Sequence, residues 1–277
     1  MKWKRSERLV EMTRHLLESP HQLIPLTVFS ERFQAAKSSI SEDLTIIKET
    51  FEESGAGKLL TVSGAAGGVK YIPLMSDRAV REVIAQMIEE LGHSDRLLPG
   101  GYLYMTDLLG NPQLMDKVGR VFASAFANHN IDVIMTVATK GIPIAQAIAR
   151  HLNVPVVIVR RDSKVTEGST VSINYVSGST RRIQTMVLSK RSMKSGQRVL
   201  VTDDFMKAGG TMLGMRHLVE EFDCELAGAA VLVESEHTEE VLVENYRSLV
   251  KLCKVNERDR TIELEDGNYF LEGGDER

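Results

Sequence analysis

Two adjacent carboxylates, Asp203 and Asp204, follow a strand-like run and precede a turn of small residues. The apolar run 199–201 predicts a buried strand, and an apolar helical pattern begins at Met212. The carboxylates can accept hydrogen bonds from the vicinal hydroxyls of a ribose. Backbone N–H groups of residues 208–211, at the start of a helix, can converge on a phosphate. The segment therefore predicts a site for a phosphorylated sugar.

Each piece of this segment also has a purely structural interpretation. A Gly-Gly pair after a strand is often a tight turn, and an Asp-Asp pair is often a solvated loop tip. The joint pattern favours a ligand site, because the strand, the acid pair and Gly209-Gly210-Thr211 fall in register. The carboxyl end of a strand is also where open α/β sheets bind ligands. The segment resembles the phosphoribosyl pyrophosphate (PRPP) motif of type I phosphoribosyltransferases.

A second loop predicts another anion site. Residues 131–137 form a predicted strand, Thr139, Lys140 and Gly141 follow it, and a helix with Pro143 in its first turn begins at Ile142. A lysine beside a glycine at the start of a helix suits an anion, although a solvated lysine is the simpler alternative. In type I phosphoribosyltransferases the equivalent loop holds the pyrophosphate, so the resemblance implies the same role for this loop.

A third segment resembles a flap over the site. The predicted strand 154–160 ends at Arg160, and Lys164 follows shortly after it. Residues 165–178 are rich in Ser, Thr and Gly and have no helical period, as expected for a lid that excludes water from bound phosphates. The simpler interpretation is an ordinary hairpin that pairs residues 166–175 with residues 182–188, and the same segment can be both a hairpin and a flap.

The elements that carry these loops predict an α/β fold behind a smaller N-terminal domain. From residue 77 onward, strands and helices alternate, which is typical of a mostly parallel sheet. Pro73 and the Ser76-Asp77 pair mark the change, so we expect domains at 1–74 and 75–277. The second resembles a type I phosphoribosyltransferase fold. A short strand near Tyr102 and Tyr104 should bury Tyr104.

The sequence pattern of the first domain predicts a winged helix-turn-helix. Apolar spacing indicates helices at 5–17, 26–33 and 42–52, followed by strands at 59–62 and 69–72. We expect Thr27 to cap the second helix, and Ser39 or Ser41 to cap the third. The third helix is then the recognition helix, which lies in the major groove of DNA in this class of fold.

The charge of this domain supports DNA binding only weakly. Residues 1–14 carry five basic and two acidic residues, but residues 1–74 carry ten and nine. A module for dimerisation or lid closure is therefore the alternative. The residues expected to contact DNA are the basic N-terminus and the polar start of the third helix. They are Lys2, Lys4, Arg5, Lys37, Ser38, Ser39 and Ser41.

The composition excludes several other classes of protein. The 277 residues carry a net charge of −4, with 43% hydrophobic and 26% charged residues, as in ordinary soluble proteins. No apolar run is long enough to span a membrane, and no signal-peptide core follows the N-terminus. Cys224 and Cys253 lack metal-ligand spacing, so we expect buried reduced thiols in a cytoplasmic protein.

Together the two halves resemble the purine biosynthesis operon repressors of Gram-positive bacteria. Five segments carry this resemblance along nearly the whole chain: 37–43, 98–102, 139–141, 164–178 and 203–211. The resemblance implies a homodimer with a winged helix that binds double-stranded operator DNA. It also implies a phosphoribosyltransferase-like domain without transferase activity, in which PRPP is the effector that lowers affinity for the operator. The match is weakest after Thr261.

The resemblance also assigns roles in the effector site. Asp203 and Asp204 would hold the ribose, and Ala208, Gly209, Gly210 and Thr211 the 5′-phosphate. Lys140 and Gly141, with Arg160 or Lys164, would meet the pyrophosphate, and Lys207 lies in the same loop as the phosphate site. Tyr102 and Phe205 would flank a base, so an alarmone or similar purine nucleotide could compete.

No catalytic residue, protein-bound metal or required cofactor is expected, and Mg²⁺ stays an optional companion of PRPP. Two alternatives remain open at this stage. One is an active purine phosphoribosyltransferase whose N-terminal module serves assembly. The other is a DNA-binding protein whose ligand site is a relict and senses nothing.

Overall fold

The computed structural model describes residues 3–64, 67–162, 168–176, 183–236 and 246–271. The chain divides into two compact units. One comprises residues 1–77 together with 151–153, and the other comprises residues 78–150 and 154–277. The first unit thus runs three residues beyond the expected boundary at residue 74. Within the described ranges, no helix combines the length and the apolar character needed to cross a membrane.

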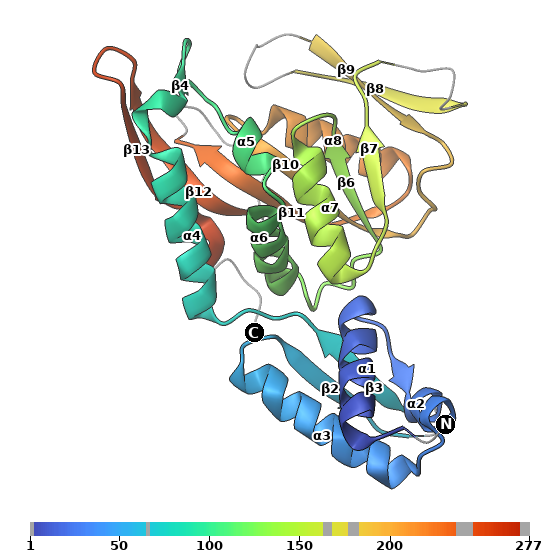
Figure 1. Cartoon of the computed structure of the whole chain (residues 1–277). Coiled ribbons are helices and arrows are strands. Elements are labelled where there is room, and N and C mark those ends of the chain that lie inside the picture. Colours follow the sequence, from blue (N-terminus) through green and yellow to red (C-terminus); the bar gives the residue numbers. More distant parts are fainter. Residues whose placement is uncertain (1–2, 65–66, 163–167, 177–182, 237–245, 272–277) are drawn as a thin grey trace. The chain divides into compact units, whose positions relative to one another are not determined.

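The N-terminal unit has the predicted three helices and wing (Figure 1). The helices are α1 (Arg5–Glu18), α2 (Leu26–Phe33) and α3 (Lys37–Glu53). An antiparallel sheet of order β1-β3-β2 combines β2 (Lys58–Val62) and β3 (Gly68–Ile72) with the two-residue β1 (Ile24–Pro25), which the sequence did not predict. Buried apolar side chains from all three helices and the sheet form one core.

The predicted helix caps in this unit are wrong. Helix α3 begins at Lys37, five residues earlier than expected, with Ala36 as its N-cap. The reason is Ile40, which is fully buried and extends the apolar stripe of this helix by one turn, so Ser39 and Ser41 lie inside the helix. Thr27 also lies inside its helix, which Pro25 precedes without a side-chain cap.

The second unit is built on a six-stranded sheet of order β13-β12-β11-β10-β6-β7. All neighbouring pairs are parallel except β12 with β13. The strand bounds are as follows: β6 Val133–Val137, β7 Val156–Val159, β10 Arg198–Met206, β11 Glu225–Ser235, β12 Tyr246–Asn256 and β13 Thr261–Asp266. The predicted mostly parallel α/β sheet is therefore confirmed.

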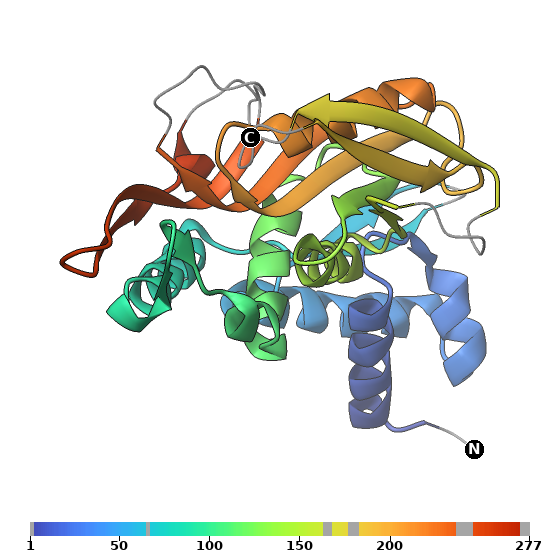
Figure 2. The same ribbon diagram turned by 90° about the horizontal axis from the view of Figure 1, so that it is seen from above.

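Helices cover both faces of this sheet (Figures 1 and 2). Helices α6 (Pro112–Ala125) and α7 (Gly141–Leu152) lie on one face, and α8 (Gly210–Glu221) lies on the other. Alternate residues of the central strands, such as Met135 and Val201, share a core cluster with the methionines of α8. Because both faces are covered, the ligand-binding positions are left at the ends of the strands.

An antiparallel hairpin packs on α8 (Figure 2). It pairs β8 (Thr170–Val176) with β9 (Ile183–Ser189), as the hairpin alternative predicted. A methyl group on Gly214 of α8 would lie 3.0 Å from both Tyr175 and Met186, so this helix and the hairpin are in close contact. The expected flap residue Lys164 lies outside the described residues.

A second, shorter hairpin forms a hood, which we define as residues 97–103. It pairs β4 (Leu97–Leu98) with β5 (Tyr102–Leu103), between α4 (Asp77–Leu91) and α5 (Thr106–Leu109). Arg96 fixes its base through two hydrogen bonds to Asp107, of 2.8 and 2.9 Å. Tyr104 is 44% exposed, so the expected burial of this side chain is wrong.

The C-terminal edge of the sheet is held by a buried polar network. Glu234 accepts hydrogen bonds from the hydroxyls of Tyr246 and Ser248. The backbone N–H of Ser248 in turn donates to the side chain of Asn268, over 2.7 Å. Asn268 begins the 3₁₀ helix η3 (Asn268–Phe270), so the network ties η3 to the sheet.

Candidate functional site

A cavity of about 740 Å³ opens in the second unit, at the carboxyl ends of its parallel strands. That volume falls in the usual range for sites that bind small molecules. Four parts of the chain line it together with Arg161: residues 98–103 and 105 around the hood, loop 137–140, segment 203–212, and the strand ends at 235 and 252–255. The acid pair, the glycine turn and the loop after residue 137, which the sequence singled out, thus meet around one space.

Asp203 and Asp204 lie inside β10, because this strand continues to Met206 rather than ending at Thr202. Asp203 is buried, and its Oδ1 accepts the backbone N–H of Asp204 over 3.0 Å. Burial raises the pKa of Asp203 well above its usual range, and repulsion from Asp204 raises it further. A ligand that brings hydroxyl donors or a cation to this pair would stabilise its ionised form.

The loop predicted to bind a phosphate is a sharp turn into α8. Gly209 is the N-cap of that helix and has a φ of 78°, a conformation that favours glycine. The helix begins at Gly210, two residues earlier than the predicted start at Met212. The first N–H groups of a helix lack partners within it, so those of Gly210 and Thr211 can bind an anion. Lys207 and Ala208 also line the cavity at this turn.

The 138–141 loop lies against strands β6 and β10. Thr139 and Lys140 are exposed and line the cavity, whereas Gly141 is buried at the start of α7. The Thr136 hydroxyl donates to the Thr202 carbonyl over 2.9 Å, and a methyl group on Gly141 would lie 2.1 Å from that hydroxyl oxygen. Glycine here allows the helix to start directly beside β6 and β10.

The remaining predicted residues divide between the cavity wall and its surroundings. Tyr102 and Phe205 line the cavity, and Tyr102 is 56% exposed. Arg160 does not line it; its neighbour Arg161 does. Arg160 instead forms an isolated bridge with Val187 of the β8–β9 hairpin.

One wall of the cavity was missed by sequence reasoning. Strand β12 contributes residues 252–255, including Cys253 and Lys254. Cys253 is a partly exposed free thiol, as is Cys224, so the expected burial of the cysteines is wrong. No motif marks this strand, and it reaches the site only through its place in the sheet, next to β11.

The expected DNA-contacting residues lie mainly on the outer face of α3. Lys37, Ser38 and Ser41 are exposed and Ser39 is half-buried. Lys4 is exposed before the first turn of α1, and its backbone N–H donates to Glu7. Arg5 instead pairs with Asp43 over 2.9 Å, and Lys2 lies outside the described residues.

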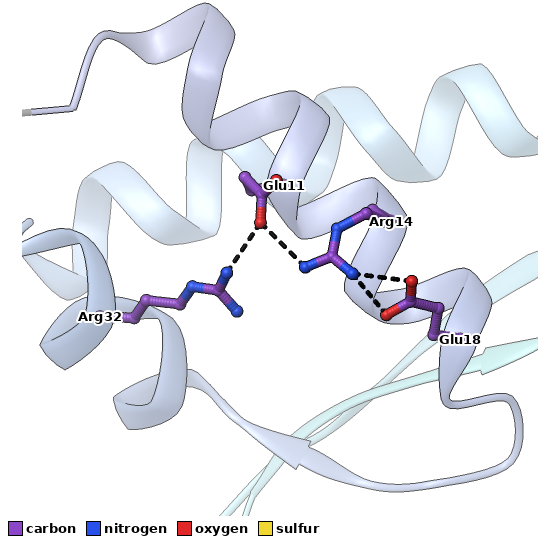
Figure 3. A network of polar contacts seen from close by, with 4 residues as sticks. All are labelled: Glu11, Arg14, Glu18 and Arg32. Carbon is purple, nitrogen blue, oxygen red and sulfur yellow. Dashed lines mark hydrogen bonds and ion pairs between the residues drawn. The ribbon is translucent and has the colours of Figure 1, made fainter.

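A network of exposed ion pairs joins α1 to α2 (Figure 3). Glu11 accepts from Arg14 over 3.1 Å and from Arg32 over 2.7 Å, and Arg14 also contacts Glu18. The hydrogen bond from Arg14 is the main reason that the pKa of Glu11 is lowered. The basic surplus near the N-terminus is therefore partly neutralised inside the unit.

Comparison with known proteins assigns both units to families. Residues 4–73 match the family of bacterial purine repressor N-terminal domains, and residues 105–259 match the phosphoribosyl transferase domain family. The purine biosynthesis transcriptional repressor PurR of Bacillus subtilis (strain 168) is 61% identical over 270 residues, which are 98% of this chain and 95% of that protein. The chain belongs to the PurR family of purine biosynthesis transcriptional regulators.

Relatives in the PurR family include both repressors and activators. The purine biosynthesis transcriptional activator PurR of Lactococcus lactis subsp. lactis (strain IL1403) is 48% identical over 267 residues, which are 96% of this chain and 98% of that protein. Among solved structures, adenine phosphoribosyltransferase from Thermoanaerobacter pseudethanolicus matches with a TM-score of 0.52 and 21% identity. The match covers 60% of this chain and 98% of the enzyme. This likeness shows the fold of the second unit alone.

The described residues were compared with the ligand sets that a protein uses to hold a metal on its own. Across the parts of the chain that the structure describes, no three His, Cys, Asp or Glu side chains group as metal ligands. Asp203 and Asp204 form a pair, and Mg²⁺ commonly uses one or two carboxylates together with the phosphates of a substrate. The site therefore fits Mg²⁺ only as part of a complex with a phosphorylated ligand.

Proposed function

We propose that this chain represses purine biosynthesis genes by binding operator DNA, and that PRPP in the cavity weakens this binding. The observation that carries the proposal is the convergence of three predicted subsites on one cavity. An acid pair suits the ribose, a helix N-terminus suits the 5′-phosphate, and Lys140 with Arg161 suits the pyrophosphate. PRPP carries these three groups on one sugar.

Regulation follows if PRPP and operator DNA favour different states of the protein. A ligand shifts an equilibrium only through its differential affinity for the two states. High PRPP signals unused capacity for purine synthesis, so release of the operator under that condition is the physiologically sensible direction. We propose that the regulator acts as a homodimer in the cytoplasm, as operators with two half-sites generally require.

The cavity also has room for a competing nucleotide. Tyr102 and Phe205 lie beside the subsites for ribose and phosphate, and aromatic rings offer stacking surfaces to a purine. A purine nucleotide with a diphosphate, such as an alarmone, would share the anion subsites with PRPP. Competition at equilibrium against labelled PRPP tests this point, and an alarmone that fails to displace PRPP contradicts it.

The second candidate function is an active purine phosphoribosyltransferase. Its support is the likeness of fold to adenine phosphoribosyltransferase and the intact PRPP motif. The family membership favours regulation, so we expect no steady release of pyrophosphate when the chain is incubated with PRPP and each common purine base. Sustained turnover with any base would contradict a purely regulatory role.

Titration calorimetry with PRPP tests the effector site directly. The double variant Asp203→Ala, Asp204→Ala should lose PRPP binding while it retains binding to operator DNA. Glu220→Gln with Glu221→Gln is the matched control, because it removes two exposed charges that do not line the cavity. PRPP affinity that survives in the Asp203/Asp204 variant would place the effector elsewhere.

A further inference from the structure

An ionic cluster around a buried carboxylate joins α1 to α3 in the N-terminal unit. Asp43, in the second turn of α3, is 0% exposed. Its Oδ1 accepts a hydrogen bond from Nε of Arg5 over 2.9 Å, and its Oδ2 accepts one from Nε of Arg8 over 2.9 Å. A second nitrogen of Arg8 lies 2.8 Å from the same Oδ2. Each carboxylate oxygen is thus held by a different arginine of α1.

Such a cluster constrains the orientation of α3 relative to α1 more tightly than an apolar contact does. A buried carboxylate without partners is costly, so the two guanidinium groups must stay in place for α3 to pack. Guanidinium groups also bind carboxylates in a fixed planar geometry. The cluster therefore fixes the position of α3 both along and around its own axis relative to α1, whereas apolar contacts tolerate small slips.

Exposed positions in the first turns of α3 carry the residues expected to reach DNA. Lys37, Ser38 and Ser41 are exposed, while Ile40 and Asp43 point into the core. Because a helix is rigid over this length, a rotation at Asp43 moves the exposed side chains by a similar angle. A small rotation is enough to break hydrogen bonds to base edges, which need close alignment.

We propose that Asp43 is a positioning residue for DNA recognition, and that it acts through Arg5 and Arg8. The inference rests on the proposed DNA-binding function. It assigns Arg5 a different role from direct phosphate contact, since the Nε of this side chain is committed to Asp43. Asp43 holds the reading face of α3 in register with the major groove and does not itself touch DNA.

The test compares operator with random-sequence DNA. Fluorescence anisotropy measures the affinity of the full chain for a purine-operon promoter fragment and for a random duplex of equal length. Asp43→Asn removes a negative charge, so simple electrostatics predicts equal or tighter binding to both duplexes. Positioning predicts instead that the ratio of operator to random affinity falls about tenfold, the size of one lost base contact.

Glu42→Gln is the matched control. Glu42 neighbours Asp43 and lies 3.9 Å from Arg5, but its side chain is 71% exposed. The control makes the same change in net charge without opening the buried cluster, so the operator-to-random ratio should stay at the wild-type value. The salt dependence of random-duplex binding should not weaken in either variant, because neither loses a phosphate contact.

A second variant keeps the test valid if Asp43→Asn does not fold. Arg8→Lys retains the charge but loses the planar group that binds the carboxylate, so the same fall in the ratio is expected from a folded protein. Thermal melting followed by circular dichroism verifies that each variant is folded. An unchanged ratio in a folded Asp43→Asn or Arg8→Lys variant overturns the positioning role. If the wild-type chain itself shows no preference for the operator, the proposed DNA-binding function fails, and the positioning role fails with it.

Discussion

Replacing Gly141 by Ala should test how closely the 138–141 loop is packed on the sheet. The added methyl group would lie 2.1 Å from the hydroxyl oxygen of Thr136, far inside an ordinary contact distance. That hydroxyl cannot move without weakening its 2.9 Å hydrogen bond to the carbonyl of Thr202. Overpacking costs about 1–3 kcal/mol and a lost buried hydrogen bond about 1 kcal/mol, so we expect a loss of about 2–4 kcal/mol of unfolding free energy.

A double-mutant cycle isolates the predicted clash. Thr136→Ala alone loses the hydrogen bond and should cost about 1–2 kcal/mol. In Thr136→Ala, Gly141→Ala the oxygen is gone and the remaining Cβ of residue 136 lies 3.5 Å away, an ordinary contact. The double variant should therefore be about as stable as Thr136→Ala, which gives a favourable coupling of about 2 kcal/mol or more.

Equilibrium urea denaturation of the four proteins measures the cycle. Titration with PRPP follows in parallel, because displacement of the 138–141 loop should weaken effector binding in Gly141→Ala and restore it in the double variant. Additive effects of the two substitutions would refute the packing argument. So would a Gly141→Ala protein that is as stable as the wild type.

Three further perturbations have expected outcomes. Asp203→Asn should raise the melting temperature at neutral pH. The pKa of Asp203 is raised in the folded state, so ionisation of this carboxyl destabilises the folded protein as pH rises, and asparagine cannot ionise. Calorimetry should show that the same variant loses PRPP binding. His21, whose pKa burial lowers to about 4, should make stability fall as pH drops through about 6.5 towards 4. Urea denaturation at stepped pH should show a flatter profile for His21→Asn, and an equally steep one would contradict the assignment. Asn111→Ala removes the N-cap of α6, whose side chain accepts hydrogen bonds from two backbone N–H groups over 3.0 and 3.1 Å. Thermal unfolding should show a loss of about 1 kcal/mol of stability, and an unchanged stability would show that the cap does not stabilise this helix.

Sequence reasoning worked best where one short segment holds a complete local signal. The strand, acid pair and glycine turn of residues 199–211 are contiguous, so their register could be predicted without knowing the rest of the fold. The wing strands were equally accessible, because their apolar residues recur regularly. The wing strands have the bounds that the pattern predicted, to within about two residues, a normal error for element ends, whereas the strand that carries the acid pair runs to Met206 rather than ending at Thr202.

The failures came from choices that tertiary packing decides. Ser39 and Ser41 are good caps by residue type, but burial of Ile40 stabilises an earlier start of α3 by more than a cap could. The position of Arg161 at the cavity depends on the exact end of β7, which periodicity does not define. Lys254 belongs to a strand without any motif, and it reaches the cavity only because β12 lies beside β11 in the sheet.

We propose that PRPP binds in the cavity and that its binding changes the affinity of the chain for DNA. The most direct test of this proposal is the affinity of the chain for a purine-operon promoter fragment, measured over a titration of PRPP at fixed salt and Mg²⁺. We predict that operator affinity falls as PRPP saturates the site, and that the Asp203→Ala, Asp204→Ala variant binds the operator but ignores PRPP. An operator affinity that does not change with saturating PRPP would contradict the account.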